Sequence, residues 1–350
     1  MENASSPEIP RVGFSMGEPG GVGPQLLLTF LEREGWQEAY IPVIFGHRKV
    51  IERWRSYLGL RSLRYHGIRH PAEVRPSHIN LVECGEIGDF SLGRSSMEGG
   101  AFAREAFVRA VQAAHAGEVD LLVTLPVDKV TFYDAEKFPY RGHTEYLRER
   151  YAGFFPLMVM VSDILRVAIL TEHIPLAEVA SSLSGEKLYQ SIQVLYAALQ
   201  RDFAVPLPRI AVLGLNPHAG DGGLLGKEEQ EILLPVLQRL QEEGMSVGGP
   251  FSPDGFFFSG QYRAVDAVLA LYHDQGLIPF KLMAGWDGFQ YTAGLPFIRT
   301  APDHGVAYDK VGTEKVELGS LSSAVWEGLS ILRRRRAYDQ ERRLSSKEVL

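Results

Sequence analysis

Three histidines follow apolar segments that have the composition of strands, and this shared context predicts a metal site. His173 comes after VAILTE, His218 after AVLGLNP and His273 after AVLALY. Each imidazole would therefore lie just beyond the C-terminal end of a strand, where open α/β sheets bind their ligands. Three neutral imidazoles can hold a divalent metal ion and leave room for substrate or water. Three unrelated polar loop residues would give the same pattern, and the residues alone leave both interpretations open.

Two glycine-rich loops are expected to line a cleft. The segment SMGEPGGVGP (15–24) joins a predicted strand to a predicted helix and could present backbone N–H groups to an anion. It is not the dinucleotide fingerprint, because Leu26 stands where the third glycine belongs. The segment HAGDGGLLGKEE (218–229) is not an ATP-binding P-loop, because Asp221 and Glu228 replace the first glycine and the Ser or Thr. A kinase or an ATPase is therefore disfavoured.

A histidine and a threonine stand at an expected helix start in RGHTEYL (141–147). Thr144 and the first N–H groups of that helix could bind phosphate, or Thr144 could be an ordinary helix cap. Lys281 and Arg299 follow apolar runs, and a charge in such surroundings needs a partner. That partner is either a bound phosphate or carboxylate, or a nearby aspartate of the chain.

The segments that would position these residues alternate between strand-like and helix-like patterns. This alternation predicts an α/β fold with a mostly parallel sheet. Strands are expected at 11–15, 41–46, 79–84, 120–126, 166–173 and 209–218, a strand-to-loop unit at 266–276, and helices at 23–35, 99–117, 186–203, 226–244 and 321–336. Pro235 is expected to kink its helix, and Arg333–Arg336 to form a solvated helix end rather than a phosphate or RNA patch.

The composition of the chain argues against several classes of protein. A chain of 350 residues predicts two lobes, and its net charge of −7 argues against a nucleic-acid binder that relies on a basic surface. The single cysteine, Cys84, excludes an intrachain disulfide and suits a reducing cytoplasm. The longest apolar runs have strand length and are far below the roughly 20 residues of a membrane span, so no membrane partner is expected.

Taken together, the motifs resemble the 4-hydroxythreonine-4-phosphate dehydrogenase family of pyridoxal phosphate (vitamin B6) biosynthesis. The resemblance extends from about Arg11 to about Val316. It is carried by SMGEPGGVGP, LPVDK (125–129), GHTEYL (142–147), TEHIPL (171–176), GLNPHAGDGGLLGKEE (214–229), DAVLALYHDQGLIPFK (266–281) and GLPFIRTAPDHGVAYD (294–309).

The resemblance implies an isocitrate/isopropylmalate-dehydrogenase-like fold with the active site between two α/β lobes. We expect the lobes at 1–137 with 296–350 and at 138–295. It also implies a homodimer with shared active sites, and an NAD- or NADP-dependent oxidation of 4-phosphooxy-L-threonine. The product, 2-amino-3-oxo-4-phosphooxybutanoate, would lose CO2 to give 3-amino-2-oxopropyl phosphate.

The resemblance also implies roles for individual residues. One divalent ion (Zn, Mg or Co) per active site falls on His173, His218 and His273, and catalytic roles fall on Lys281 and Asp254. Substrate-binding positions fall on His143, Thr144, Lys281, Gln290 and Arg299.

Several positions depart from the family pattern. Gln290 stands where Asn is usual, most of the segment 283–294 diverges, and Glu18, Glu172 and Leu224 replace the usual Asp, Thr and His. The departures leave open a related phosphorylated four-carbon substrate, such as 4-phosphothreonate or 4-phosphoerythronate. A metal-dependent phosphohydrolase or acyltransferase, or a non-catalytic metabolite binder, are the rival interpretations.

Overall fold

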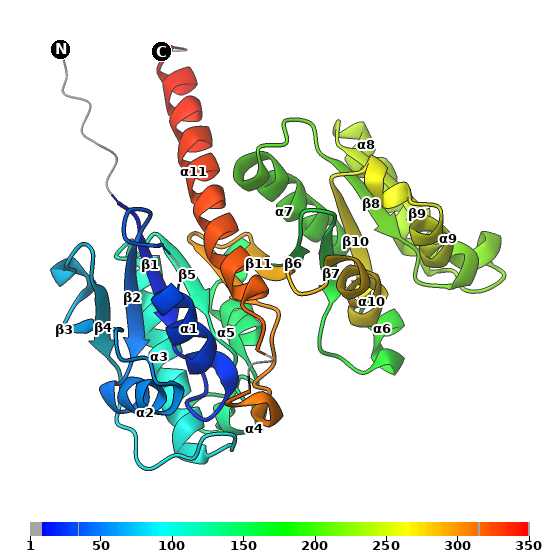
Figure 1. Ribbon diagram of the computed structural model, residues 1–350. Coiled ribbons are helices and arrows are strands. Elements are labelled where there is room, and N and C mark those ends of the chain that lie inside the picture. Colours follow the sequence, from blue (N-terminus) through cyan, green and yellow to red (C-terminus); the bar gives the residue numbers. More distant parts are fainter. Residues whose placement is uncertain (1–8, 34, 314–315, 349–350) are drawn as a thin grey trace. The chain divides into compact units, whose positions relative to one another are not determined.

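The computed structural model describes residues 9–33, 35–313 and 316–348, with side chains to residue 345 (Figure 1). The chain forms two compact units. The first contains the chain up to Arg150 and Pro296–Leu329, and the second contains Tyr151–Leu295 and the chain from Ser330 onward. The predicted lobes differ from these units at 138–150, which belong to the first unit, and at 330–350, which belong to the second.

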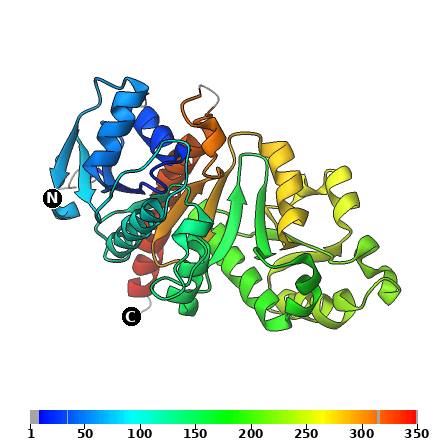
Figure 2. The same ribbon diagram turned by 90° about the horizontal axis from the view of Figure 1, so that it is seen from below.

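The first unit is a parallel sheet with helices on both faces. Its strands lie in the order β3-β4-β2-β1-β5-β12, and each neighbouring pair is parallel. Helix α3 packs on β1, β2 and β5, and α1 lies on the other side of the strands (Figure 2). The strands are Arg11–Ser15 (β1), Ile41–Gly46 (β2), Tyr65–Ile68 (β3), Ile79–Glu83 (β4), Leu121–Thr124 (β5) and Ile298–Pro302 (β12).

The helices of the first unit begin and end at residues with the expected capping chemistry. Helix α3 (Met97–His115) begins after Ser96, whose side chain accepts a hydrogen bond from the N–H of Gly99. Helix α2 (Arg48–Leu58) ends at Gly59, which is left-handed. The other helices are α1 (Val22–Arg33), α4 (Lys129–Phe132), α5 (His143–Arg150) and the first part of α11 (Gly319–Glu348).

The second unit has a mixed sheet in the order β11-β6-β7-β10-β8-β9. Strand β6 is antiparallel to both β11 and β7, and the remaining pairs are parallel. The strands are Leu157–Val161 (β6), Arg166–Thr171 (β7), Arg209–Leu213 (β8), Ser246–Phe251 (β9), Ala267–Tyr272 (β10) and Phe289–Ala293 (β11). The helices are α6 (Leu176–Ser182), α7 (Gly185–Phe203), α8 (Leu234–Glu242), α9 (Pro253–Phe258), α10 (His273–Ala284) and the last part of α11.

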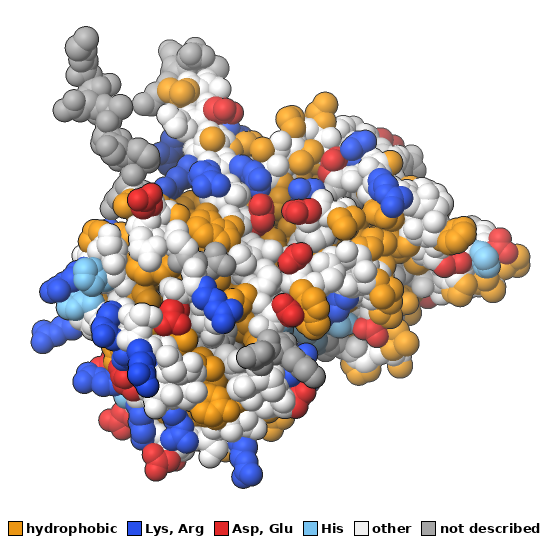
Figure 3. Space-filling model, in the orientation of Figure 1, with side chains coloured by type: hydrophobic (Ala, Val, Ile, Leu, Met, Phe, Trp, Pro, Cys, Tyr) orange, Lys and Arg blue, Asp and Glu red, His pale blue; other side chains and the backbone are white. Residues whose placement is uncertain are grey.

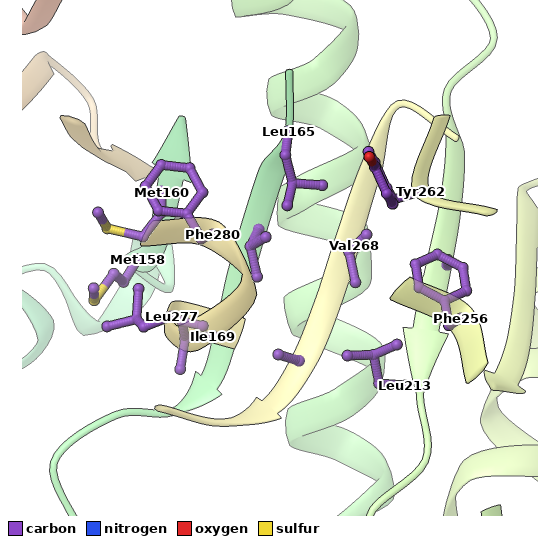
Figure 4. Close-up of a cluster of buried hydrophobic side chains, with 13 residues drawn as sticks. Met158, Met160, Leu165, Ile169, Leu213, Phe256, Tyr262, Val268, Leu277 and Phe280 are labelled. Carbon is purple, nitrogen blue, oxygen red and sulfur yellow. The ribbon is translucent and has the colours of Figure 1, made fainter. Parts of the chain in front are cut away.

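A buried cluster fixes α10 against the sheet of the second unit. Phe280 and Leu277 of α10 pack with Ile169 of β7, and Val268 of β10 lies in the same cluster (Figure 4). Burial of one such side chain contributes about 1.5–3 kcal/mol to stability. The cluster therefore determines where the first residue of α10, His273, is placed.

Two expectations about local structure are wrong. The strand-to-loop unit at 266–276 is a strand followed directly by helix α10. Pro235, by contrast, lies within the expected helix, directly after the irregular π-helical turn Glu229–Leu233 and in the first turn of α8. The run Arg333–Arg336 is not a helix end, since α11 continues to Glu348. Within the run, Arg335 is buried and its Nε donates to Asp202 at 2.6 Å.

Candidate active site

The predicted site residues fall into two groups, one in each unit, and each group has its own geometry. The first unit carries His143, Thr144 and Arg299, and the second carries the remaining predicted positions. No helix in the described residues is long and apolar enough to cross a membrane.

Two of the three predicted metal histidines lie together in the second unit. His173 follows β7 and His273 follows β10, and these neighbouring parallel strands pair with Thr171 opposite Tyr272. Their shared edge brings the two imidazole rings to 5.7 Å between centroids. Both histidines line one pocket, together with Thr171, Leu176 and other residues that follow β7 and β10.

Each of these imidazoles has a carboxylate near its Nδ1. The Nδ1 of His273 lies 2.7 Å from Oδ1 of Asp274, and the Nδ1 of His173 lies 3.9 Å from Oε2 of the buried Glu172. In His273, a proton on Nδ1 that is shared with Asp274 would leave the lone pair on Nε2 for a metal ion, whereas the 3.9 Å separation at His173 is too long for a hydrogen bond. The chemistry of this pair therefore fits a divalent cation.

The third histidine, His218, lies in a left-handed turn after β8. From His218 to Gly222 every residue has a positive φ, between 43° and 80°. The buried carboxylate of Glu229 holds the start of this turn, because it accepts the backbone N–H groups of Leu215 and Asn216 at 2.8 Å each. In the described part of the chain, no three His, Cys, Asp or Glu side chains are grouped closely enough to hold a metal ion. The three-histidine site therefore stays a prediction.

The other predicted residues of the second unit occupy different elements. Asp254 is exposed in the first turn of α9. Hydrogen bonds from Ser252 and from the N–H of Gly255 lower the pKa of the Asp254 carboxyl, and His218 adds to the shift. Lys281 is exposed on α10, two turns after His273, and Gln290 is half-buried in β11. His273 and Lys281 thus lie on one helix, α10.

In the first unit, Arg299 and His143 form a buried polar site. Arg299 is 2% exposed, and its Nε and Nη2 donate to Oγ1 of Thr124 at 3.0 and 2.6 Å. His143 is the first residue of α5, as predicted, and stacks on Phe107 at 4.2 Å. Burial, helped by the charge of Arg299, lowers the pKa of His143 well below its ordinary value, so the ring is neutral at neutral pH.

Among the described residues, several buried side-chain polar atoms lack a hydrogen-bond partner, and three of those in the first unit are candidates to bind a ligand. They are Nε2 of His143, Oγ of Ser15 and Oε2 of Glu18. Ser15 pairs with Thr124 across β1 and β5, so its side chain lies on the same sheet face as the hydroxyl that holds Arg299. A buried unpaired polar atom costs about 1–3 kcal/mol, which a polar ligand would offset.

Sequence reasoning did not select two of the residues around Arg299 in the first unit. Ser15 and Thr124 are the last residues of β1 and β5. A hydroxyl side chain at the carboxyl end of a parallel strand is the signal that would have found them. Glu18 was noted only as a departure from the family pattern.

Comparisons with known proteins agree on one family. The family described as "Pyridoxal phosphate biosynthetic protein PdxA" matches residues 38–327. A 4-hydroxythreonine-4-phosphate dehydrogenase from Bacteroides thetaiotaomicron is 38% identical over 93% of this chain and 89% of its own length. The crystal structure of a protein of the same name from Klebsiella pneumoniae covers 94% of this chain and 99% of its own, with a TM-score of 0.79 and 33% identity. A terephthalate 1,2-cis-dihydrodioldehydrogenase structure from Burkholderia xenovorans covers 92% and 98% of the two chains, with a TM-score of 0.60 and 26% identity.

Proposed function

The chain belongs to the PdxA family of pyridoxal phosphate biosynthetic proteins, and from this premise we propose that it is a 4-hydroxythreonine-4-phosphate dehydrogenase. It would oxidise the C3 alcohol of 4-phosphooxy-L-threonine to 2-amino-3-oxo-4-phosphooxybutanoate, which decarboxylates to 3-amino-2-oxopropyl phosphate. The observation that carries the proposal is the 38% identity over 93% of the chain to a protein of that name. The single, buried Cys84 is compatible with a cytoplasmic location.

The family implies a nicotinamide cofactor and a divalent metal ion, and the proposal assigns residues to the metal. His173, His218 and His273 would hold one Zn, Mg or Co ion. That ion would supply Lewis acidity at the substrate oxygen. NAD or NADP would supply the hydride acceptor. The carboxylate of Asp274, hydrogen-bonded to Nδ1 of His273, would keep the Nε2 lone pair of His273 oriented toward the ion.

The substrate carries a phosphate and a carboxylate, and the chain offers groups suited to both. Arg299 is a permanent cation whose position the Thr124 hydroxyl fixes. The neutral His143 ring has one buried nitrogen without a partner, and Thr144 lies in the first turn of α5. We assign substrate binding to these residues and to Lys281 and Gln290. Lys281 and the ionised Asp254 are the candidates for proton transfer.

We also propose a homodimer with shared active sites. The support, besides the family, is an apolar surface along α10, where Ile278 is 59% and Leu282 82% exposed, with Trp286 55% exposed just beyond the helix. Figure 3 shows hydrophobic side chains around the region of α10. Exposed apolar residues grouped in this way are typical of protein interfaces.

The test of the proposed function is a substrate panel. We expect absorbance at 340 nm to rise with NAD or NADP and 4-phosphooxy-L-threonine, and to rise more slowly with 4-phosphothreonate and 4-phosphoerythronate. Release of free phosphate without a change at 340 nm would instead identify a phosphohydrolase. The longer Gln290 is the reason to include the two analogues, and Gln290→Asn tests whether it sets the preference.

A further inference from the structure

The ends of β7 and β10 are joined by a buried side-chain hydrogen bond. Oγ1 of Thr171 donates to the backbone oxygen of Leu271 at 2.6 Å, and Thr171 is 2% exposed. Thr171 lies two residues before His173, and Leu271 lies two residues before His273. The bond therefore connects the two backbone segments that carry the paired imidazoles.

A second side chain joins β10 to β8 where the backbone ladder has ended. Backbone pairing between these strands runs from Ala267 opposite Ile210 to Leu269 opposite Val212. Beyond it, Oε1 of Gln275 accepts the N–H of Leu271 at 2.7 Å, and Nε2 of Gln275 donates to the oxygen of Gly214 at 2.6 Å. Gly214 begins the segment that leads to His218.

Both backbone polar groups of Leu271 are thus hydrogen-bonded to side chains. The two bonds have the length of good neutral hydrogen bonds, and Gln275, at 8% exposed, is shielded from competing water. A strand end would otherwise be free to fray, because it lacks ladder bonds on one side. The network places all three histidine-bearing segments on one rigid support.

We propose that Thr171 and Gln275 are positioning residues, which tie the ends of β7, β10 and β8 together and so set the spacing of His173, His273 and His218. This inference rests on the proposed metal-dependent function. Neither side chain needs to touch the metal ion or the substrate for this role. Residues that orient metal-ligating histidines in this indirect way typically change metal affinity by 10–100-fold when they are removed.

The test measures Co2+ affinity directly, by calorimetry and by the visible absorption of the bound ion. The variants are Thr171→Val, Gln275→Leu and Thr171→Ser, and Thr300→Val is the matched control. Thr300 is likewise buried in a strand and donates to a backbone oxygen, that of Ala324 at 2.8 Å, but it belongs to the first unit. His173→Ala defines which part of the Co2+ binding belongs to the histidine site.

We expect Thr171→Val and Gln275→Leu to weaken Co2+ binding at least about tenfold and to alter its absorption spectrum. Thr300→Val should bind like the wild type, although it loses an equivalent bond, and Thr171→Ser should restore affinity because it keeps the hydroxyl. If both Thr171→Val and Gln275→Leu bind Co2+ with the affinity and spectrum of the wild type, the positioning role is overturned and the proposed metal site still stands. A wild-type protein without Co2+ binding at His173 would overturn the proposed metal site and this inference with it.

Discussion

At the scale of single residues, Glu18 shows how tertiary burial changes a side chain's chemistry. It lies 1% exposed after β1, and its Oε1 accepts a long bond, 3.5 Å, from the N–H of Gly20. Burial, together with the charge of Asp128, raises the pKa of the Glu18 carboxyl to about 7, although hydrogen bonds from Gly20 and Thr131 lower it. A carboxyl in this position holds its proton near neutral pH.

The raised pKa predicts how stability depends on pH. Between about pH 4.5 and 7 the folded state binds more protons at Glu18 than the unfolded state, so the free energy of unfolding falls as pH rises. In Glu18→Gln, we expect the decrease in the free energy of unfolding between these pH values to be smaller by up to about 3 kcal/mol. Urea unfolding of both proteins at pH 5, 6, 7 and 8 measures it. Parallel curves for the two proteins would show that Glu18 ionises normally.

Kinetic measurements on a Lys281 variant distinguish proton transfer from phosphate binding. Lys281→Met should lower kcat strongly if the amine moves a proton, or chiefly raise KM if it anchors phosphate. Lys137→Met, which removes another exposed lysine, is the control. If both parameters of Lys281→Met stay within about twofold of wild type, roughly 0.4 kcal/mol, neither role stands.

At the scale of elements, the left-handed turn after β8 groups several residues in an unfavourable backbone conformation. His218, Ala219 and Asp221 adopt positive φ without being glycine, which costs about 1–2 kcal/mol per residue. Bonds to Glu229 and the close approach of the turn to Gly214 hold it in place. Strain that surrounding contacts maintain in this way is typical of functional loops.

Relief of that strain should be measurable. Ala219→Gly is expected to raise the free energy of unfolding by about 0.5–1 kcal/mol, because glycine adopts φ near 51° without the Cβ penalty. The greater flexibility of glycine in the unfolded state offsets only part of this stabilisation. The control Ala197→Gly, on an exposed face of α7, should lower stability by about 1 kcal/mol. Equal losses in both variants would contradict the strained turn.

At the scale of the whole molecule, the apolar surface on α10 predicts self-association. We expect the wild type to sediment as a dimer and Leu282→Lys to dissociate it, because a charge buried at an apolar interface is strongly unfavourable. Leu207→Lys is the matched control, since Leu207 is 79% exposed and Leu282 82% exposed, both in the second unit. A wild-type monomer at working concentration would refute the dimer.

Shared active sites have a separate test. Variants His218→Ala and His273→Ala, each inactive alone, should regain activity when mixed if the two ligands of one site come from different subunits. Recovery requires subunit exchange, which sedimentation of labelled mixtures verifies. A mixture that exchanges subunits and stays inactive would place both ligands of each site in one chain.

Much of the fold could be predicted because its determinants are local. Apolar runs such as LLVT and AVLALY became β5 and β10, and the serine before MEGGAFAREA caps α3. The parallel arrangement followed from the alternation of strands and helices. The antiparallel placement of β6 was not predicted, because an apolar run carries no information about the direction of its neighbour.

For the candidate site, the sequence could predict only that residues following parallel strands lie at the same edge of the sheet. The sequence by itself determined the family, the α/β class and the positions of His173 and His273 just after strands, whereas the structure showed that these strands are neighbours. Tertiary structure alone decided that Thr171 bonds Leu271, 100 residues away, that Gln275 bridges to Gly214, and that Arg335 is buried against Asp202. Such contacts depend on sheet register and on which helix face is covered. Register and burial arise from the packing of distant segments, which no local pattern encodes.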